Sequence, residues 1–143
     1  MKRFLSKSAD QTRKFASAFA CRLRPGDVLA LHGDLGTGKT CFVQGVAQGL
    51  GMTEVVNSPT YLIMHEYSGV VSLNHIDLYR LKTIGEVLDF GFEDHLYSNA
   101  VTAIEWPEIA TEYLPRHTYH IRLAHGDSPN IREITIEPRE HKC

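Results

Sequence analysis

The sequence predicts an α/β sandwich with a mixed, mostly parallel central sheet flanked by helices. Three observations predict this class: a short apolar run at residues 28–31, a glycine-rich loop directly after it, and a helical stretch with one apolar face after the loop. Strands and helices then mix along the rest of the chain, as in layered α/β folds. The 143 residues are 43% hydrophobic and 22% charged, so we expect a single domain over residues 1–143 with its own core.

The opening segment predicts a helix, a turn and a buried strand. Ser8 and Gln11 have the spacing of a capping box, in which Ser8 caps the helix and Gln11 reaches back. Apolar residues at helical spacing follow as far as Leu23, and residues 24–27, Arg-Pro-Gly-Asp, predict a turn. The unbroken apolar run at 28–31 is typical of a strand buried within a parallel sheet.

The elements after the glycine-rich loop follow from the same patterns. A second helix has Phe42, Val43 and Val46 on its apolar side, and Gly51 stands at the position of a C-terminal cap. The remaining segments are each a short apolar or helical pattern bounded by turn residues. They predict strands at 61–67 and 70–77 joined by a tight Ser68-Gly69 turn, a helix at 83–89, a strand at 100–104, and a terminal β-hairpin of 118–124 and 131–136.

The glycine-rich loop fits the phosphate-binding pattern G-x-x-x-x-G-K-[ST] at every defined position. It reads Gly33-Asp34-Leu35-Gly36-Thr37-Gly38-Lys39-Thr40. Glycines let successive backbone N–H groups turn toward an anion, and the helix that follows directs its positive end at the same phosphates. The pattern predicts that Lys39 binds phosphate and that the Thr40 hydroxyl ligates Mg²⁺. We therefore expect a P-loop NTPase-like fold that binds a nucleotide and Mg²⁺.

Two acidic residues end predicted strands and compete for the metal and water-orienting roles that hydrolysis requires. Asp77 ends the predicted strand at 70–77, and Glu105 follows the predicted strand at 100–104. In α/β sheets, ligands bind at such strand ends. P-loop proteins that are specific for guanine carry the element Asn-Lys-x-Asp. The nearest match in this sequence, at 74–77, lacks the lysine and lies in a predicted strand. The sequence thus favours adenine, and ATP is the expected nucleotide.

Composition limits the partners and the compartment. Fifteen Lys and Arg against seventeen Asp and Glu give a net charge of -2, which argues against coating a nucleic-acid backbone, so DNA is not an expected partner. Cys21, Cys41 and Cys143 are far apart, as in a reducing compartment. No apolar run approaches the roughly 20 residues of a membrane helix. We expect a cytoplasmic protein that does not enter membranes.

Four elements in this order resemble the TsaE (YjeE) family, bacterial ATPases of tRNA threonylcarbamoyladenosine synthesis. The elements are the phosphate loop with Leu31 and His32 before it, Ser58-Pro59-Thr60-Tyr61, residues 75–80, His-Ile-Asp-Leu-Tyr-Arg, and residues 104–108, Ile-Glu-Trp-Pro-Glu. The phosphate loop is generic, whereas the other three together are specific. The resemblance covers nearly the whole chain.

The resemblance implies roles for individual residues. It places Thr60 in a switch-like loop near the γ-phosphate and metal, Asp77 at the Mg²⁺ ion, and Glu105 as the Walker-B-like acid that positions water. It also places Trp106 beside the nucleotide, where it contributes to activity. The implied function is ATP hydrolysis, weak alone, that supports a TsaB–TsaD complex in modifying adenosine 37 of ANN-decoding tRNAs, with tRNA reached through that complex.

One residue departs from the family pattern, and two other functions remain open. Cys41 stands where family members commonly carry a second hydroxyl residue. Its backbone N–H can still contact phosphate, but the contact that a side-chain hydroxyl would make is lost or weakened. A thiol at a helix N-terminus is also a candidate for redox sensitivity.

A small nucleoside or metabolite kinase would need an acceptor pocket and an arginine-rich lid, and neither is evident. A non-hydrolysing nucleotide-gated module would not need Glu105.

Overall fold

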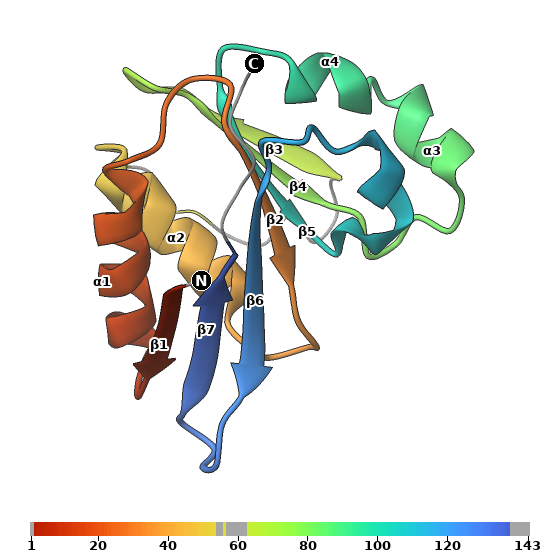
Figure 1. Cartoon of the computed structure of the whole chain (residues 1–143). Helices are drawn as coiled ribbons and strands as arrows, with labels where there is room; N and C mark the ends of the chain where they lie inside the picture. The colour runs from red at the N-terminus through yellow and green to blue at the C-terminus, as the bar shows by residue number, and fades with distance from the viewer. Residues whose placement is uncertain (1, 54–55, 57–62, 138–143) are drawn as a thin grey trace.

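The computed structural model describes residues 2–53, 56 and 63–137. Its strands form a seven-stranded sheet in the order β1-β7-β6-β2-β5-β4-β3, with helices on both faces (Figure 1). The elements, in chain order, are β1 (Lys2–Ser6), α1 (Ala9–Ala20), β2 (Val28–His32), α2 (Lys39–Gly49), β3 (Met64–Tyr67), β4 (Leu73–Asp77), α3 (Ile84–Asp89), α4 (Phe92–Leu96), β5 (Val101–Glu105), the 3₁₀ helix η1 (Pro107–Tyr113), β6 (Tyr119–His125) and β7 (Arg132–Ile136).

The centre of the sheet is parallel and its margins are antiparallel. Strand β2 lies between β5 and β6 and is parallel to both, and β4 is parallel to β5. The hairpins β3–β4 and β6–β7 add antiparallel neighbours, and β1 closes the sheet antiparallel to β7. This confirms the predicted mixed, mostly parallel sheet and the terminal hairpin. Because β2, β4 and β5 run in one direction, the residues that follow them gather at one edge.

Two apolar cores cover the two faces of the sheet. Alternation along β2 sends Leu29 and Leu31 into the core under α1 and α2, and Val28 into the core under α3, α4 and η1. Phe42 from α2 and Phe92 from α4 are fully buried centres of the two cores. No helix among the described residues is long and apolar enough to span a bilayer.

Helix α2 packs unusually closely on α1 because glycine faces α1 at two positions one turn apart. A Cβ atom built on Gly45 would lie 2.4 Å from the backbone oxygen of Arg13 and 2.7 Å from the Ala16 Cβ atom. One built on Gly49 would lie 2.4 Å from the backbone oxygen of Ser17. The backbones therefore approach to a distance that other residues prevent, and this contact fixes α2, which begins at the phosphate loop.

Several local features differ from the sequence expectations. Strand β1 and helices α4 and η1 were not predicted, and the tight Ser68-Gly69 turn is wrong, because the link between β3 and β4 runs from Ser68 to Ser72. Residues 61–62 of the predicted strand lie outside the described residues. Ser8 caps α1 by accepting from the Gln11 backbone N–H, but the Gln11 side chain accepts from the backbone of Lys7 rather than from that of Ser8.

Candidate functional site

The phosphate-binding pattern forms a loop between β2 and α2, as the sequence predicted. Two of its glycines are required by geometry. A Cβ atom at Gly33 would lie 2.5 Å from the backbone oxygen of Leu123 and 2.6 Å from the Thr37 hydroxyl oxygen. Gly38 caps α2 with φ of 99°, a conformation that L side chains rarely adopt. The loop backbone is thus held in the curved form that an anion cradle needs.

Lys39 is buried at the mouth of this loop. Its ammonium donates to the backbone oxygens of Gly33 and, at 3.2 Å, of Asp34, and it lies 3.6 Å from the centre of the Trp106 ring. Burial lowers the pKa of Lys39, while the surrounding carboxylates, Glu105 first among them, act in the opposite direction. The ammonium is therefore a partly desolvated cation held by weak acceptors, an arrangement that suits an incoming phosphate.

Thr40, Asp77 and Glu105 supply oxygen atoms beside the lysine. Glu105 is 3% exposed and accepts from the Thr40 hydroxyl, whose oxygen lies 3.0 and 3.2 Å from the two carboxylate oxygens. Asp77 is the register partner of Glu105 on the neighbouring parallel strand, and its carboxylate accepts from the Tyr79 backbone at 2.9 Å. Burial raises the pKa of Asp77.

This donor set fits a small, hard cation. Mg²⁺ prefers oxygen ligands and is usually held by one or two carboxylates together with substrate phosphates and water. Two carboxylates and a hydroxyl meet these needs, and none of the three is an imidazole or a thiolate. The donor set thus fits Mg²⁺ better than Zn²⁺, which takes nitrogen and sulfur ligands.

Trp106 follows Glu105 directly and covers the lysine. Its φ and ψ of 56° and 56° make it the one non-glycine residue with positive φ in the described part of the chain. Such a conformation costs on the order of 1 kcal/mol and clusters at ligand sites. The Tyr79 ring packs against the indole at 4.8 Å and is itself 58% exposed. An aromatic pair therefore borders the phosphate loop.

A cavity of about 290 Å³ lies on another side of the loop. Gly36, Gly38 and Cys41 line it from the loop and from α2. Its other walls come from the start of α1, from the β6–β7 connection and from the first residue of β7: Ser8, Ala9, Thr12, Asn130 and Arg132. Arg13 donates to the Cys41 sulfur at 3.3 Å. The cavity adjoins the N-terminus of α2, as a nucleoside next to an α-phosphate would require.

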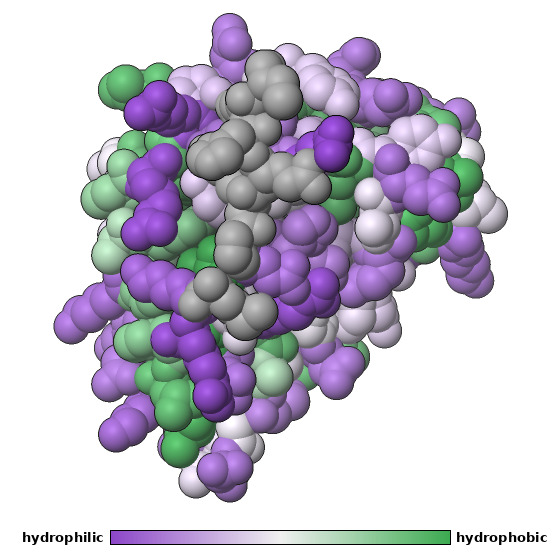
Figure 2. Space-filling view, viewed as in Figure 1, coloured by the Kyte–Doolittle hydropathy of each residue, from purple (hydrophilic) through white to green (hydrophobic). Residues whose placement is uncertain are grey.

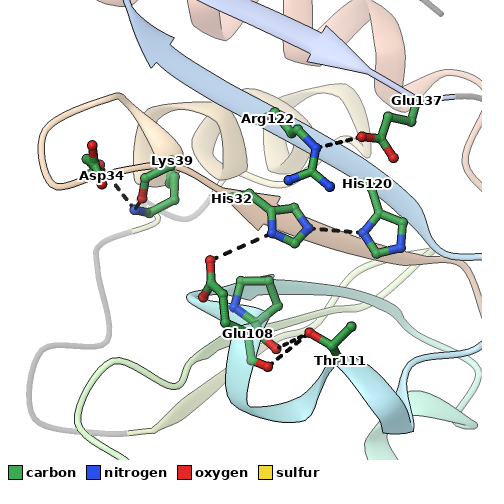
Figure 3. A network of polar contacts seen from close by, with 10 residues as sticks. His32, Asp34, Lys39, Glu108, Thr111, His120, Arg122 and Glu137 are labelled. Atoms are coloured by element: carbon green, nitrogen blue, oxygen red, sulfur yellow. Dashed lines mark hydrogen bonds and ion pairs between the residues drawn. The ribbon is translucent and has the colours of Figure 1, made fainter.

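A polar network lies beside the site at the end of β2 (Figure 3). The His32 ring is placed between Glu108 of η1, 3.7 Å from its Nδ1 atom, and His120 of β6, 3.0 Å from its Nε2 atom. Next to the two histidines, the Nε atom of Arg122 lies 2.6 Å from a carboxylate oxygen of Glu137. Burial lowers the pKa values of His32 and His120. The network ties η1, and with it the segment after Trp106, to β2 and β6.

The fold brings most of the predicted site residues together. Lys39, Thr40, Asp77, Glu105 and Trp106 converge at the ends of β2, β4 and β5. Asp34, Leu35, Gly36 and Thr37 complete the loop, with Leu35 68% exposed at its tip. Thr60 lies outside the described residues.

Three histidines near the site make different contacts. The His117 ring lies 3.2 Å from the Gly26 backbone oxygen, whereas His120 contacts His32. On β4, the Nε2 atom of His75 lies 2.6 Å from Glu105. The alternation of His75 with Asp77 is the signal that places it on the face of the site.

Comparison with known proteins agrees with the geometry. A family model described as "Threonylcarbamoyl adenosine biosynthesis protein TsaE" matches residues 6–134. The chain belongs to the TsaE family. It is 41% identical over 128 residues to the tRNA threonylcarbamoyladenosine biosynthesis protein TsaE of Bacillus subtilis, covering 89% of this chain and 79% of that protein. The Treponema pallidum protein of the same name is 39% identical, over 94% of this chain and 98% of its own length.

A solved structure supports the fold assignment. The chain superposes on the crystal structure of Bacillus subtilis YdiB with a TM-score of 0.80 and 34% sequence identity, over 94% of this chain and 83% of that chain. The TsaE family is thus shown both by sequence and by fold, and the family takes part in the biosynthesis of threonylcarbamoyladenosine in tRNA.

Proposed function

We propose that the protein is an Mg²⁺-dependent ATPase that supports threonylcarbamoyl modification of adenosine 37 in ANN-decoding tRNAs, acting with a TsaB–TsaD complex. The observation that carries the proposal is the contact between Thr40 and Glu105 beside Lys39. The lysine and the hydroxyl of the phosphate-binding pattern meet a buried carboxylate at the end of β5, in a chain of the TsaE family.

Each residue has a defined task in this proposal. Lys39 leaves the loop carbonyls and binds the β- and γ-phosphates, which are stronger acceptors for an ammonium. Backbone N–H groups of residues 33–41 hold the phosphate chain, and Thr40, Asp77 and Glu105 hold Mg²⁺, which would neutralise developing charge on the phosphates. Glu105 orients the attacking water. Trp106 packs beside the nucleotide and keeps Lys39 in place.

The cavity next to Cys41 supports a place for the nucleoside. It lies beyond Gly36 and Gly38, so a phosphate chain that runs from Lys39 along the loop would direct its nucleoside there. Its volume of about 290 Å³ is at the small end of ligand pockets, which suits one base and part of a ribose. ATP is the proposed nucleotide, because the chain lacks the element typical of guanine specificity.

The proposal places the tRNA substrate on partner proteins in the cytoplasm. The cavity beside the loop is only large enough for one base and part of a ribose, so the proposal assigns it to the nucleotide and leaves the acceptor adenosine to the partners. A net charge of -2 also gives no general attraction for a tRNA backbone. The exposed Tyr79 and the half-buried Trp106 border the site and offer a partner an aromatic contact surface.

One experiment tests the proposal against its alternatives. Phosphate release from labelled ATP is measured with and without purified TsaB–TsaD, for the native chain, Glu105→Ala and the control Glu112→Ala, an exposed acid of η1. We expect release that TsaB–TsaD increases and that only Glu105→Ala abolishes. Release that needs neither Glu105 nor partners would refute the proposal. Transfer of label to a nucleoside would identify a kinase, and tight binding without turnover would identify a nucleotide-gated module.

A further inference from the structure

The best-buried ionisable side chain near the site belongs to a residue that the proposed mechanism does not use. His75 lies on β4 two residues before Asp77 and is completely buried, on the sheet face that α1 and α2 cover. Its register partner on β5 is Ala103, a residue of the apolar core. The surroundings of the imidazole are thus those of a core position, where an apolar side chain would pack without a desolvation penalty.

The imidazole makes one strong polar contact. Its Nε2 atom lies 2.6 Å from Oε2 of Glu105, and because a carboxylate only accepts, the imidazole is the donor. The other ring nitrogen, Nδ1, has no hydrogen-bond partner among the described residues. A buried polar ring with one nitrogen unsatisfied is a poor choice for packing alone. The contact with Glu105 is therefore what the histidine contributes.

That contact distinguishes the two oxygens of the Glu105 carboxylate. The Thr40 hydroxyl approaches both, at 3.2 Å from Oε1 and 3.0 Å from Oε2, whereas His75 approaches only Oε2. The terminal torsion of a glutamate is otherwise broad and nearly two-fold. With Oε2 bound by His75, the carboxylate plane is fixed, and Oε1 is the oxygen with the smaller number of donors around it.

We propose that His75 is a positioning residue, which holds Glu105 so that Oε1 faces the water and the metal. The inference rests on the proposed ATP hydrolysis and deepens it. Glu105 lies between the hydroxyl of the phosphate loop and an imidazole on the next strand, so its orientation is determined from two sides. Removal of comparable outer partners of ligating carboxylates lowers activity or metal affinity by about 10- to 100-fold.

Substitutions of His75 can separate positioning from packing. His75→Leu fills the space without a donor, His75→Gln keeps an N–H near the place of Nε2, and His75→Asn keeps a shorter amide that does not reach Glu105. The matched control is Asn74→Ala, which removes a buried polar side chain from the same strand on the other sheet face. Thermal unfolding of each variant, and the tryptophan fluorescence change on adding ADP without Mg²⁺, check the fold and the phosphate loop.

The expected result is a change in kcat that follows the donor. In ATP hydrolysis with TsaB–TsaD, His75→Leu and His75→Asn should lower kcat by about 10- to 100-fold, with ADP binding unchanged. His75→Gln should recover most of the loss, and Asn74→Ala should behave as the native chain.

The outcomes that overturn the inference are distinct from failure of the proposed function. If the native chain does not hydrolyse ATP with its partners, the proposed function fails and this inference fails with it. If native hydrolysis is present and His75→Leu retains it, only the inference fails. The inference also fails if His75→Gln is as impaired as His75→Leu.

Discussion

Replacing Gly45 with alanine tests the close contact between α1 and α2. Helix propensity alone favours alanine over glycine in a helix by about 1 kcal/mol. At Gly45 the new Cβ atom would lie 2.4 Å from the Arg13 backbone oxygen and 2.7 Å from the Ala16 Cβ atom. Neither neighbour can turn aside, because one is backbone and the other is a side chain without a rotamer. Relief therefore requires that the helices separate.

The magnitude follows from the two opposing effects. Overpacking of this kind costs about 1–3 kcal/mol, and the propensity gain of about 1 kcal/mol offsets part of it. The net effect is a loss of about 1 kcal/mol, which lowers the melting temperature by about 4 °C for a domain of this size. Gly85→Ala in α3 is the matched control, since its new Cβ atom would come no nearer than 3.8 Å to any neighbour, the Thr83 hydroxyl oxygen.

The assay is thermal unfolding followed by circular dichroism at one protein concentration. We expect Gly45→Ala to melt below the native chain and Gly85→Ala to melt at or above it. If both variants melt above the native chain, propensity dominates at Gly45 and the reasoning about the close helix contact is refuted. If both variants melt below the native chain, alanine is destabilising even at Gly85, where there is space for its Cβ atom. The Cβ distances then do not explain the loss at Gly45, and the reasoning is refuted in this case too.

Three further predictions concern the site and the network beside it. Burial lowers the pKa of His32 and of His120, so the unfolded chain binds more protons than the folded chain below about pH 6.5. The free energy of unfolding, measured by urea titration, should therefore fall as the pH drops from 7 to 5. The combined variant His32→Gln, His120→Gln should show a smaller fall over this pH range, and an unaltered fall would contradict the prediction. Cys41 lines the cavity, so ATP should slow the alkylation of its thiol by iodoacetamide, measured by mass spectrometry. Equal alkylation rates with and without ATP would place the nucleoside elsewhere. If the Cys41 thiol of the folded chain is alkylated no faster than that of the unfolded chain, the hypothesis of a redox-sensitive thiol is wrong. Ala9→Phe should fill the same cavity and weaken the binding of ATP, while inorganic tripolyphosphate still binds at the loop with its native affinity. Both affinities are measured by Trp106 fluorescence. Equal loss of affinity for the two ligands would show damage to the loop instead.

The phosphate loop and the central strands could be predicted because their signals are local. Residues 33–40 are contiguous, and glycine spacing alone fixes the curved backbone. The apolar runs before Asp77 and Glu105 identify buried strands, and the rule for strand ends brings the two acids to one edge. The register later places them side by side. In contrast, the role of Trp106 came only from the family resemblance.

The features that sequence could not give depend on contacts between distant residues. His75 reaches Glu105 across 30 positions of the chain, and the cavity joins Ala9 to Asn130. Strand β1 has a mixed, basic pattern without alternation, and its strand form comes from pairing with β7 rather than from its own residues. Helices α4 and η1 are too short for a periodic signal, and η1 begins directly after the unusual backbone of Trp106.

The position of β1 has a consequence for how the protein is made. Lys2 pairs with Ile136, and β7 separates β1 from every other strand in the described sheet order. On the ribosome, β1 is synthesised before β7 and cannot join the sheet until β7 has emerged. The stacking of Phe4 on Phe15 of α1 joins residues near each other in the chain, so it does not have to wait for β7. The nascent protein therefore completes this sheet only after residue 136 has been translated.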